Sequence, residues 1–307
     1  MSVHSLLGYA LTVPDIEPGK CFYQDFGLSG TARGNALGLR CGDDTRDTVT
    51  LEAGKGRRLH HLNFAASAEG IKALKANIES RGGQLLDPPS SEPGAAFAVR
   101  DPDGNLIVVR EAARASVLDR RKTVIDAEAA KYTRAGGRRG CPPRDMVVKP
   151  WRLGHVLLFT PDVDKQIAFY TDMLGMKLSD RSGPVIAFMR VAGGSDHHVM
   201  AFAKSDRPGF HHASFEVGGI DHVGFGAASL IGKGYRSGWG FGRHVIGSNY
   251  FYYIRDPWGS LAEYFFDIDY IADDAAWQAK DWPLEDSLYL WGPNVPEDFV
   301  QNFDVER

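Results

Sequence analysis

The chain has 307 residues, a length typical of two domains, and its 43% hydrophobic and 24% charged residues are typical of a globular protein. The net charge of −4 gives no bias toward nucleic acid or membrane surfaces, and no apolar run approaches the roughly 20 residues of a membrane span. Cys21, Cys41 and Cys141 are too few and too dispersed for a disulfide framework or a zinc cluster. With no signal-peptide segment, they predict a protein of the reducing cytoplasm.

An internal repeat divides the sequence into a first and a second half. Three pairs of segments match across it, namely 6–11 with 152–157, 59–64 with 210–215, and 100–108 with 255–263. A period of about 150 residues indicates two duplicated domains rather than a solenoid of short repeats. We therefore predict an N-terminal domain at 1–112, a connector at 113–150, a C-terminal domain at 151–268 and a tail at 269–307.

The second half opens with a pass of one strand, one helix and further strands. An apolar segment rich in β-branched and aromatic residues predicts a strand at 154–159. Apolar residues at helical spacing predict a helix at 162–174, which Gly175 ends. Two more apolar segments, at 185–191 and 199–203, are expected to be strands.

A second pass of the same kind follows, with a strand at 212–217, a helix at 220–232 and two strands at 250–255 and 261–266. The last two strands are joined by Asp-Pro-Trp-Gly at 256–259, which favours a type I turn and hence a hairpin. The first half repeats this device at 101–104. Because each half shows two such passes, the sequence predicts an α+β fold of tandem βαβββ modules.

The connector and the tail differ in composition from the two domains. Residues 111–150 carry 10 Lys/Arg against 5 Asp/Glu without interleaved aromatic residues, which favours a solvated connector that packs a helix on the body over a nucleic-acid contact. The tail places aromatic residues among acidic residues and prolines: Trp277, Trp282, Tyr289 and Trp291. Two interpretations stay open, a tail docked on the surface through its aromatics and a lid over the site described next.

Two histidines and one glutamate, His155, His212 and Glu263, lie in three separate predicted strands of the second half. Two imidazoles and one carboxylate make up the facial triad that holds Fe(II) in oxygenases. A single histidine is more often a hydrogen-bonded structural residue. Glu263, however, lies in the apolar run Leu-Ala-Glu-Tyr-Phe-Phe, where a carboxylate is costly unless it is paired or metal-bound. If the two passes pair into a curved sheet, the three side chains converge in its concavity.

The first half lacks this set of residues. In the alignment of the halves, Tyr9, His61 and Val108 take the three corresponding positions. One possible ligand of three remains, so we expect the metal site in the second half alone.

On these residues, the second half resembles the catalytic domain of the type I extradiol ring-cleavage dioxygenases of the vicinal oxygen chelate superfamily. The resemblance covers nearly the whole chain, because that family also has an inactive N-terminal domain of the same fold. It implies two half-open barrels of curved sheet and a homo-oligomer. It also implies Fe(II), with Mn(II) as the alternative, held by His155, His212 and Glu263.

Two further segments resemble motifs of this family. The segment His-His-Val-Met-Ala-Phe at 197–202 matches a motif whose second histidine is the acid/base, which implies that role for His198. The segment Gly-Arg-His at 242–244 matches a motif whose histidine hydrogen-bonds a substrate hydroxyl, which implies that role for His244.

An active-site tyrosine of the family lies ten residues before the glutamate ligand, and this spacing indicates Tyr253. Strand alternation puts Tyr253 and Phe251 on one face, and Tyr250 and Tyr252 on the other. The sequence alone does not say which face lines the pocket, so the spacing decides. The remaining histidines near these segments are interpreted as supporting or structural: His197, His211 and His222.

The implied reaction is extradiol ring cleavage, in which both atoms of O₂ enter an aromatic diol and a hydroxymuconic semialdehyde type of product forms, as in aromatic hydrocarbon breakdown. Catechol, substituted or polyhydroxylated catechols and dihydroxybiphenyl all stay open as substrates.

Two alternatives on the same fold are a metal-dependent isomerase or thiol transferase like the glyoxalases, and a non-catalytic binder of aromatic ligands. The glyoxalase-like enzymes tend to use a fourth protein ligand, and residues 199–203 offer no carboxylate or imidazole there beyond His198 at their entrance.

Overall fold

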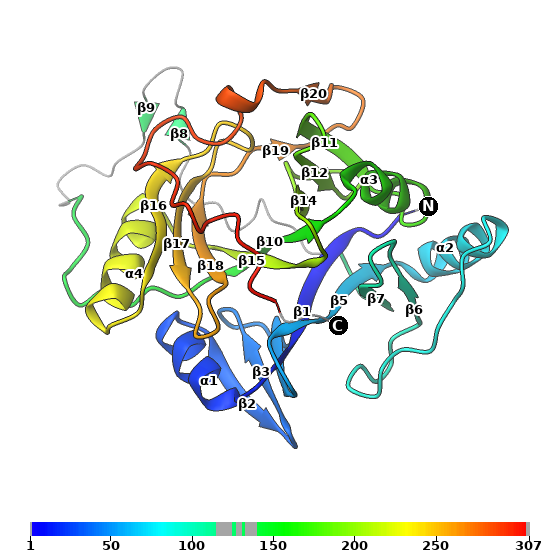
Figure 1. Ribbon diagram of the computed structural model, residues 1–307, viewed down its shortest axis with the longest axis horizontal. Helices are drawn as coiled ribbons and strands as arrows, with labels where there is room; N and C mark the ends of the chain where they lie inside the picture. Colours follow the sequence, from blue (N-terminus) through cyan, green and yellow to red (C-terminus); the bar gives the residue numbers. More distant parts are fainter. Residues whose placement is uncertain (1, 115–124, 127–130, 133–139, 305–307) are drawn as a thin grey trace.

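The first half folds into two consecutive units of one strand, one helix and further strands (Figure 1). The computed structural model describes residues 2–114, 125–126, 131–132 and 140–304. The elements of the first half are β1 (Ser5–Val13), α1 (Ile16–Asp25), β2 (Ser29–Arg33), β3 (Ala36–Arg40), β4 (Val49–Ala53), β5 (Arg58–Ala66), α2 (Ala68–Ser80), β6 (Phe97–Arg100) and β7 (Leu106–Glu111). They form a 7-stranded sheet in the order β2-β3-β4-β1-β5-β7-β6.

The second half repeats this architecture. Its elements are β10 (Arg152–Thr160), α3 (Val163–Asp172), β11 (Lys177–Ser182), β12 (Ile186–Arg190), β13 (Ser195–Asp196), β14 (Met200–Lys204), β15 (Gly209–Glu216), α4 (Ile220–Gly232), β16 (Ser237–Arg243), β17 (Tyr250–Arg255) and β18 (Leu261–Phe266). Together with β20 (Lys280–Asp281) of the tail they form a 9-stranded sheet in the order β16-β17-β18-β15-β10-β14-β12-β11-β20. The predicted α+β fold of tandem modules is confirmed.

The bounds of α4, β17 and β18 are those predicted, whereas two strands begin earlier than predicted. β10 starts at Arg152 and β15 at Gly209, because the two strands pair antiparallel along their whole length. His155 and His212 therefore lie inside their strands rather than at the starts.

The helix predicted at 162–174 is α3, which is shorter by a residue or two at each end. Asp162 is its N-cap, and the side-chain Oδ1 accepts a hydrogen bond of 3.1 Å from the Lys165 backbone N–H. This bond satisfies one of the free amides of the first helical turn, which is why the helix starts here.

The register of β1 corrects the alignment of the two halves. His155 pairs with Ser214 in β15. The residue that matches Ser214 in the first half is Asn63 of β5, and Asn63 pairs with Gly8, so Gly8 is the structural counterpart of His155. Both β1 and β10 carry a bulge just before this position. The expectation that Tyr9 corresponds to His155 is therefore wrong by one residue, because the Leu-Gly pairs at 7–8 and 153–154, which match in the alignment, occupy positions that differ by one in the two strands. Tyr9 lies buried in the core instead.

The two predicted Asp-Pro-x-Gly turns form as expected. Asp256 Oδ1 accepts hydrogen bonds of 2.9 Å from the backbone N–H groups of Trp258 and Ser260. Gly259 closes the turn at a φ of +95°, where a side chain would be strained. Asp101 plays the same part in the first half.

The two halves share one interface. They meet along β1, β5, β10 and β15, while α4 covers β16, β17 and β18 from outside (Figure 1). Phe26 of the first half stacks on Tyr264 of the second, with ring centroids 3.9 Å apart, and the Tyr264 hydroxyl donates to the Phe26 carbonyl at 2.7 Å. Burying one such aromatic side chain contributes about 1.5–3 kcal/mol, so contacts like this one bind the halves together.

The connector and the tail follow different courses. In the connector, the two short strands β8 (Ile125–Asp126) and β9 (Lys131–Tyr132) pair with each other. The helix predicted in the connector is not found at 140–150, and most of the remaining connector lies outside the described residues. The tail, orange to red in Figure 1, contains β19 (Tyr270–Ile271), β20 and the short helix η2 (Leu284–Asp286). It runs along the second-half sheet and ends beside the first half.

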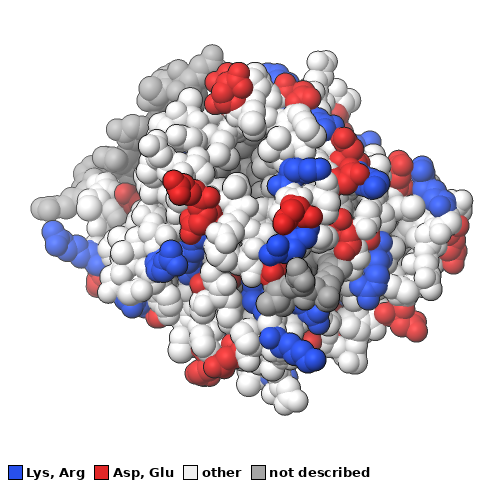
Figure 2. Space-filling model, viewed as in Figure 1, with Lys and Arg blue, Asp and Glu red and all other residues white. Residues whose placement is uncertain are grey.

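The surface carries both signs of charge. Figure 2 shows lysine and arginine side chains interspersed with aspartate and glutamate on the face it displays. Among the described residues, no helix combines the length and the apolar character needed to cross a membrane.

Candidate metal centre

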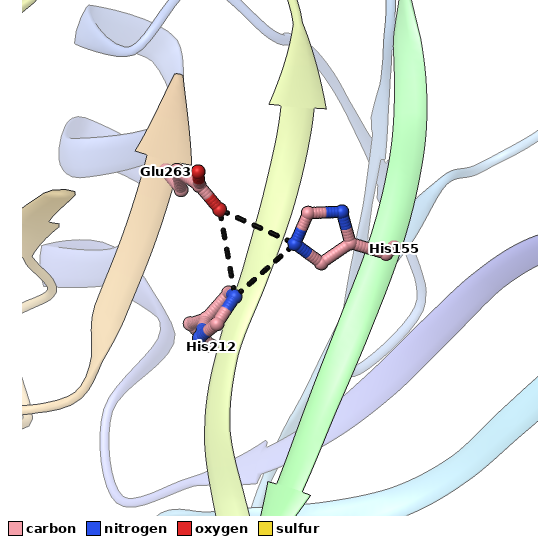
Figure 3. A group of neighbouring side chains, drawn as sticks. All are labelled: His155, His212 and Glu263. Carbon is pink, nitrogen blue, oxygen red and sulfur yellow. Dashed lines mark hydrogen bonds and ion pairs between the residues drawn. The ribbon is translucent and has the colours of Figure 1, made fainter. Parts of the chain in front are cut away.

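His155, His212 and Glu263 converge from the neighbouring strands β10, β15 and β18 (Figure 3). The two histidine Nε2 atoms are 3.3 Å apart. Glu263 Oε2 lies 3.3 Å from His155 Nε2 and 3.4 Å from His212 Nε2. Neighbouring ligands about 2.1 Å from a metal ion are roughly 3 Å apart in an octahedral site, so three such atoms fit one face of an octahedral ion.

A backbone bulge aims His155 at this point. Gly154 is the bulged residue, and a Cβ atom there would lie 2.3 Å from Cε1 of Phe265 in β18. Only glycine leaves room for the Phe265 ring at this position. The Gly-His pair in the sequence therefore serves a geometric purpose, since the glycine turns the next side chain toward the triad.

The electrostatics of the triad suit a divalent cation. The three side chains are at most 3% exposed, and burial lowers the pKa of His212 well below its usual value, which keeps the imidazole neutral and able to bind a metal. Glu263 Oε1 accepts from Asn249 Nδ2 at 3.3 Å, whereas Oε2 receives no hydrogen bond from the described residues. A buried carboxylate oxygen without a donor is costly unless a cation neutralises it.

A cavity of about 280 Å³ lies beside the triad. Its polar lining comprises His155, His198, His211, His212, His244, Asn249, Tyr253, Lys204 and Ser287. Its apolar lining comprises Leu157, Val185, Ile186, Phe188, Ala203, Ile246, Leu284, Leu288, Phe299 and Val300. A mostly apolar pocket with a few convergent polar groups is typical of a small-molecule site.

The structure brings His198 next to the triad. Its ring centroid lies 4.3 Å from that of His155, and the ring lines the cavity. Burial lowers the pKa of His198 well below its usual value, so its imidazole is neutral. A neutral imidazole has one nitrogen that can accept a proton.

His244 and Tyr253 line the cavity as a hydrogen-bonded pair. His244 Nδ1–H donates to the Leu288 carbonyl of the tail at 2.7 Å, which leaves its Nε2 as an acceptor for the Tyr253 hydroxyl at 2.9 Å. His244 Nε2 also lies 4.0 Å from Glu263 Oε1. Five of the six residues singled out in the sequence thus line one cavity, and the sixth, Glu263, lies directly behind His155 and His212, within 3.4 Å of both.

The face of β17 that lines the cavity is the one carrying Tyr253, which is 3% exposed. Tyr250 and Tyr252 lie on the other face, where Tyr250 accepts a hydrogen bond of 2.6 Å from Arg243. His222, at the start of α4, is only partly buried and is not among the residues lining the cavity.

Two residues that support the site received no specific role from the sequence. His211, interpreted only as supporting or structural, has its Nδ1 2.7 Å from Nδ1 of His212, and a hydrogen bond to the Phe299 backbone ties it to the tail. Asn249, which donates to Glu263, gave no signal of its own. A usable signal was the His-His dipeptide, which occurs three times, at 60–61, 197–198 and 211–212, each time with the two Nδ1 atoms within hydrogen-bond distance.

The corresponding place in the first half is closed by a carboxylate. Glu92 accepts hydrogen bonds from His61 Nε2 at 2.9 Å and from Asn63 Nδ2 at 2.7 Å, and it forms an ion pair with Arg110. Gly8 and Val108 supply no ligand atom there. The first half therefore satisfies its one matching histidine internally, without a metal.

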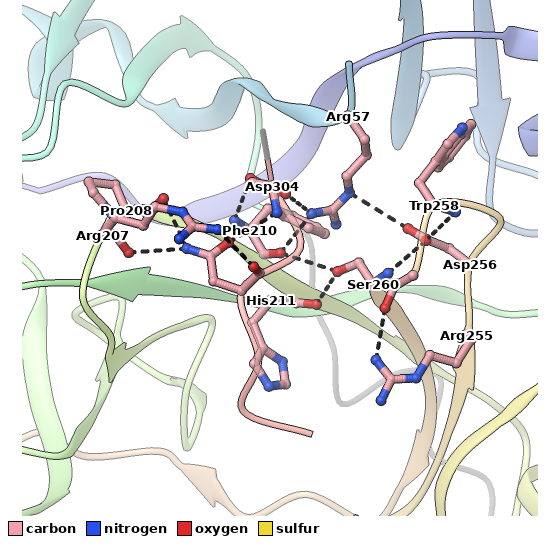
Figure 4. Close-up of polar contacts among 12 residues, drawn as sticks. Arg57, Arg207, Pro208, Phe210, His211, Arg255, Asp256, Trp258, Ser260 and Asp304 are labelled. Atoms are coloured by element: carbon pink, nitrogen blue, oxygen red, sulfur yellow. Dashed lines mark hydrogen bonds and ion pairs between the residues drawn. The ribbon is translucent and has the colours of Figure 1, made fainter. Parts of the chain in front are cut away.

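The end of the tail is anchored between the two halves (Figure 4). Arg57, from the loop before β5, forms a buried ion pair with Asp304 and lies 3.7 Å from Asp256. Asp304 Oδ2 accepts from the Phe210 backbone N–H at 2.8 Å, two residues before the ligand His212. The tail residues that line the cavity are thus held by contacts to both halves.

Comparisons with known proteins agree with this geometry. A model of the Glyoxalase/Bleomycin resistance protein/Dioxygenase superfamily matches residues 5–109 and 152–264. Metapyrocatechase 2 of Cupriavidus necator is 43% identical over 99% of this chain and 93% of its own length. An iron-dependent extradiol dioxygenase of Rhodococcus jostii is 26% identical over 95% and 97%. The solved structure of an Mn(II)-bound glyoxalase from Novosphingobium aromaticivorans has a TM-score of 0.77 at 26% identity, covering 96% of this chain and 93% of its own.

Proposed function

The chain belongs to the Glyoxalase/Bleomycin resistance protein/Dioxygenase superfamily, and within it we propose that the protein is an extradiol dioxygenase that opens catechol-type diols with O₂. The observation that carries this is a three-ligand facial triad beside a cavity whose wall presents His198, His244 and Tyr253. A metapyrocatechase that is 43% identical over 99% of this chain also supports the proposal. The product would be a hydroxymuconic semialdehyde type of compound.

We propose Fe(II) as the ion held by His155, His212 and Glu263, with Mn(II) as the alternative. A divalent ion held there would supply positive charge that lowers the pKa of the diol hydroxyls. His198 accepts a proton from a diol hydroxyl and returns it later as a general acid. The His244–Tyr253 pair orients the second diol oxygen and stabilises charge that develops on it.

The main alternative is an isomerase like the glyoxalase of similar fold. Such enzymes tend to use a fourth protein ligand. No carboxylate is found among the described residues that line the cavity, and β14 carries none either. An open face with three protein ligands favours binding of a chelating diol and O₂.

The ring substituent of the substrate is expected to be uncharged and apolar. The cavity wall includes Val185, Ile186, Leu284 and Val300, and Lys204, which also lines it, donates a hydrogen bond to the Pro161 carbonyl. The tail supplies part of this lining, so we propose that it is the lid of the pocket. A carboxylated catechol would meet Lys204 as the one Lys or Arg among the described lining residues, in a wall that is otherwise mostly apolar.

The decisive test is anaerobic loading of the protein with Fe(II), then addition of a diol and air. We expect O₂ uptake and a yellow product, with the highest kcat/KM for catechols that carry apolar substituents. A parallel loading with Mn(II) compares the two metals. Full iron occupancy without turnover on any diol would refute the dioxygenase proposal, and isomerisation of a thiohemiacetal would favour the glyoxalase-like alternative.

Two further expectations concern the intact protein. We propose a homo-oligomer, which light scattering coupled to size-exclusion chromatography would measure directly. We also propose that it works in the cytoplasm, where its three cysteine thiols would stay reduced.

A further inference from the structure

A chain of hydrogen bonds runs from Asp180 through His197 to His198, behind the wall of the cavity. Asp180 Oδ2 lies 3.1 Å from His197 Nε2, and His197 Nδ1 lies 3.0 Å from His198 Nδ1. All three side chains are buried, with exposures of 4%, 0% and 3%. The arrangement leaves His198 Nε2 as the ring nitrogen not engaged by His197.

The donors and acceptors of this chain follow from its first member. Asp180 Oδ1 accepts from the Lys280 backbone N–H at 2.7 Å, so the carboxylate is held in place by the tail strand β20. The carboxylate can only accept, so His197 carries its proton on Nε2 and its Nδ1 is an acceptor. His198 must then donate from Nδ1, and its Nε2 keeps a free lone pair.

We propose that Asp180 and His197 are positioning residues that fix the tautomer of His198 in which Nε2 is the proton acceptor. This inference rests on the proposed role of His198 as the acid/base. The proton passes from a diol hydroxyl oxygen to His198 Nε2, and His198 becomes an imidazolium whose Nδ1–H stays bonded to His197. Trp277 of the tail packs edge-on against His197, with the ring centroids 5.4 Å apart, and shields these hydrogen bonds from water.

Asp180→Asn is the sharpest test, because the side chain keeps its shape while the direction of each hydrogen bond from residue 180 to His198 is reversed. The Lys280 amide can only donate, so the new amide oxygen stays with it and the amide NH₂ turns to His197. His197 then protonates on Nδ1, His198 must accept there, and its proton moves to Nε2. We expect kcat to fall roughly 10²-fold, while metal content and the anaerobic Kd for the diol change less than about twofold.

Glu92→Gln in the first half is the matched control. It alters the same type of carboxylate–imidazole bond, to His61, in the half without the triad, and kcat per bound metal should not change. His197→Phe is a second variant, which keeps an aromatic ring against Trp277 and removes both hydrogen bonds; kcat should fall by a similar factor.

A double-mutant cycle separates positioning from a general structural effect. In a His198→Phe background, Asp180→Asn should cost nothing further, because it acts only through His198. An equal loss in both backgrounds, or unchanged kcat for Asp180→Asn in the native background, overturns the inference while leaving the role of His198 intact. Full kcat for His198→Phe alone would overturn both that role and this inference.

Discussion

Arg57 and Asp304 form a buried ion pair that joins the first half of the chain to the end of the tail, across 247 positions of sequence. The side chains are 3% and 6% exposed, and Asp256 lies on the other side of the guanidinium at 3.7 Å. The tail segment that this ion pair anchors carries Phe299 and Val300, which line the cavity. The first half, which lacks the triad, therefore helps to hold the wall of the cavity in the second half.

Arg57→Met should lower the free energy of unfolding by about 3–5 kcal/mol, because it leaves two buried carboxylates facing each other without a cation. Asp304→Asn should cost less, since Arg57 keeps Asp256. Urea unfolding followed by circular dichroism measures both. Lys233→Met is the control: its ion pair with Asp25 also joins the halves, at 2.6 Å, but is largely exposed, so its loss should cost under about 1 kcal/mol. Equal costs for the two pairs would contradict the assigned importance of burial.

Glu263→Gln should weaken metal retention at least about 10²-fold, because the charged ligand is replaced by a neutral amide at the one carboxylate of the triad. Metal content after dialysis, measured by plasma mass spectrometry, reads this directly. Val108→Glu puts a carboxylate at the matching place in the first half and should restore nothing, since Gly8 offers no ligand and His61 is engaged by Glu92. Full metal retention by Glu263→Gln would show that the triad is assigned wrongly.

Leu284→Arg should raise kcat/KM for 3,4-dihydroxybenzoate, a catechol with a carboxylate, roughly fivefold relative to an alkylcatechol. Leu284 is 58% exposed at the cavity, and an ion pair at such a site contributes up to about 1 kcal/mol. Leu290→Arg is the matched control, because Leu290 is 67% exposed on the same tail and is not among the lining residues. The same gain from both variants would mean a general charge effect rather than a specific contact.

The sequence was sufficient for the triad and for the fold. The predictions rest on patterns that are visible in the sequence itself: the apolar strand around Glu263, the internal repeat and the helical spacing. Such patterns can be interpreted without knowledge of long-range contacts. The alignment of Tyr9 with His155 failed because the Leu-Gly pairs at 7–8 and 153–154 match in sequence but occupy positions that differ by one residue in the two strands.

Long-range contacts account for the rest. The partner of His197 is Asp180, in a strand that was not predicted individually, and the partner of Arg57 lies at the other end of the chain. The backbone contacts of the tail to His244 and Asp180 carry no residue signature at all, because any residue can supply a carbonyl or an N–H.

Asp101 should make the stability of the protein depend on pH. Burial raises the pKa of Asp101 to about 6, against the hydrogen bonds from Asn105 that favour the charged form. In the unfolded chain the pKa is about 3.9. Between roughly pH 6 and pH 4 the folded protein therefore binds a proton that the unfolded chain does not, so the contribution of Asp101 to stability rises as the pH falls through this window.

Each pH unit in this window corresponds to about 1.4 kcal/mol. The native protein should therefore gain about 2–3 kcal/mol in unfolding free energy relative to Asp101→Asn between pH 7 and pH 4. Urea unfolding of both proteins at each pH measures the difference, in which all other titrating groups cancel. Asp256 is the counterpart of Asp101 in the second half, and there the Arg57 guanidinium opposes the effect of burial on the pKa. The hydrogen bonds that lower the pKa of Asp101 come instead from amide groups, those of Asn105 and the Asp103 backbone. Parallel pH profiles for the native protein and Asp101→Asn would mean that the buried carboxyl group of Asp101 keeps its ordinary pKa.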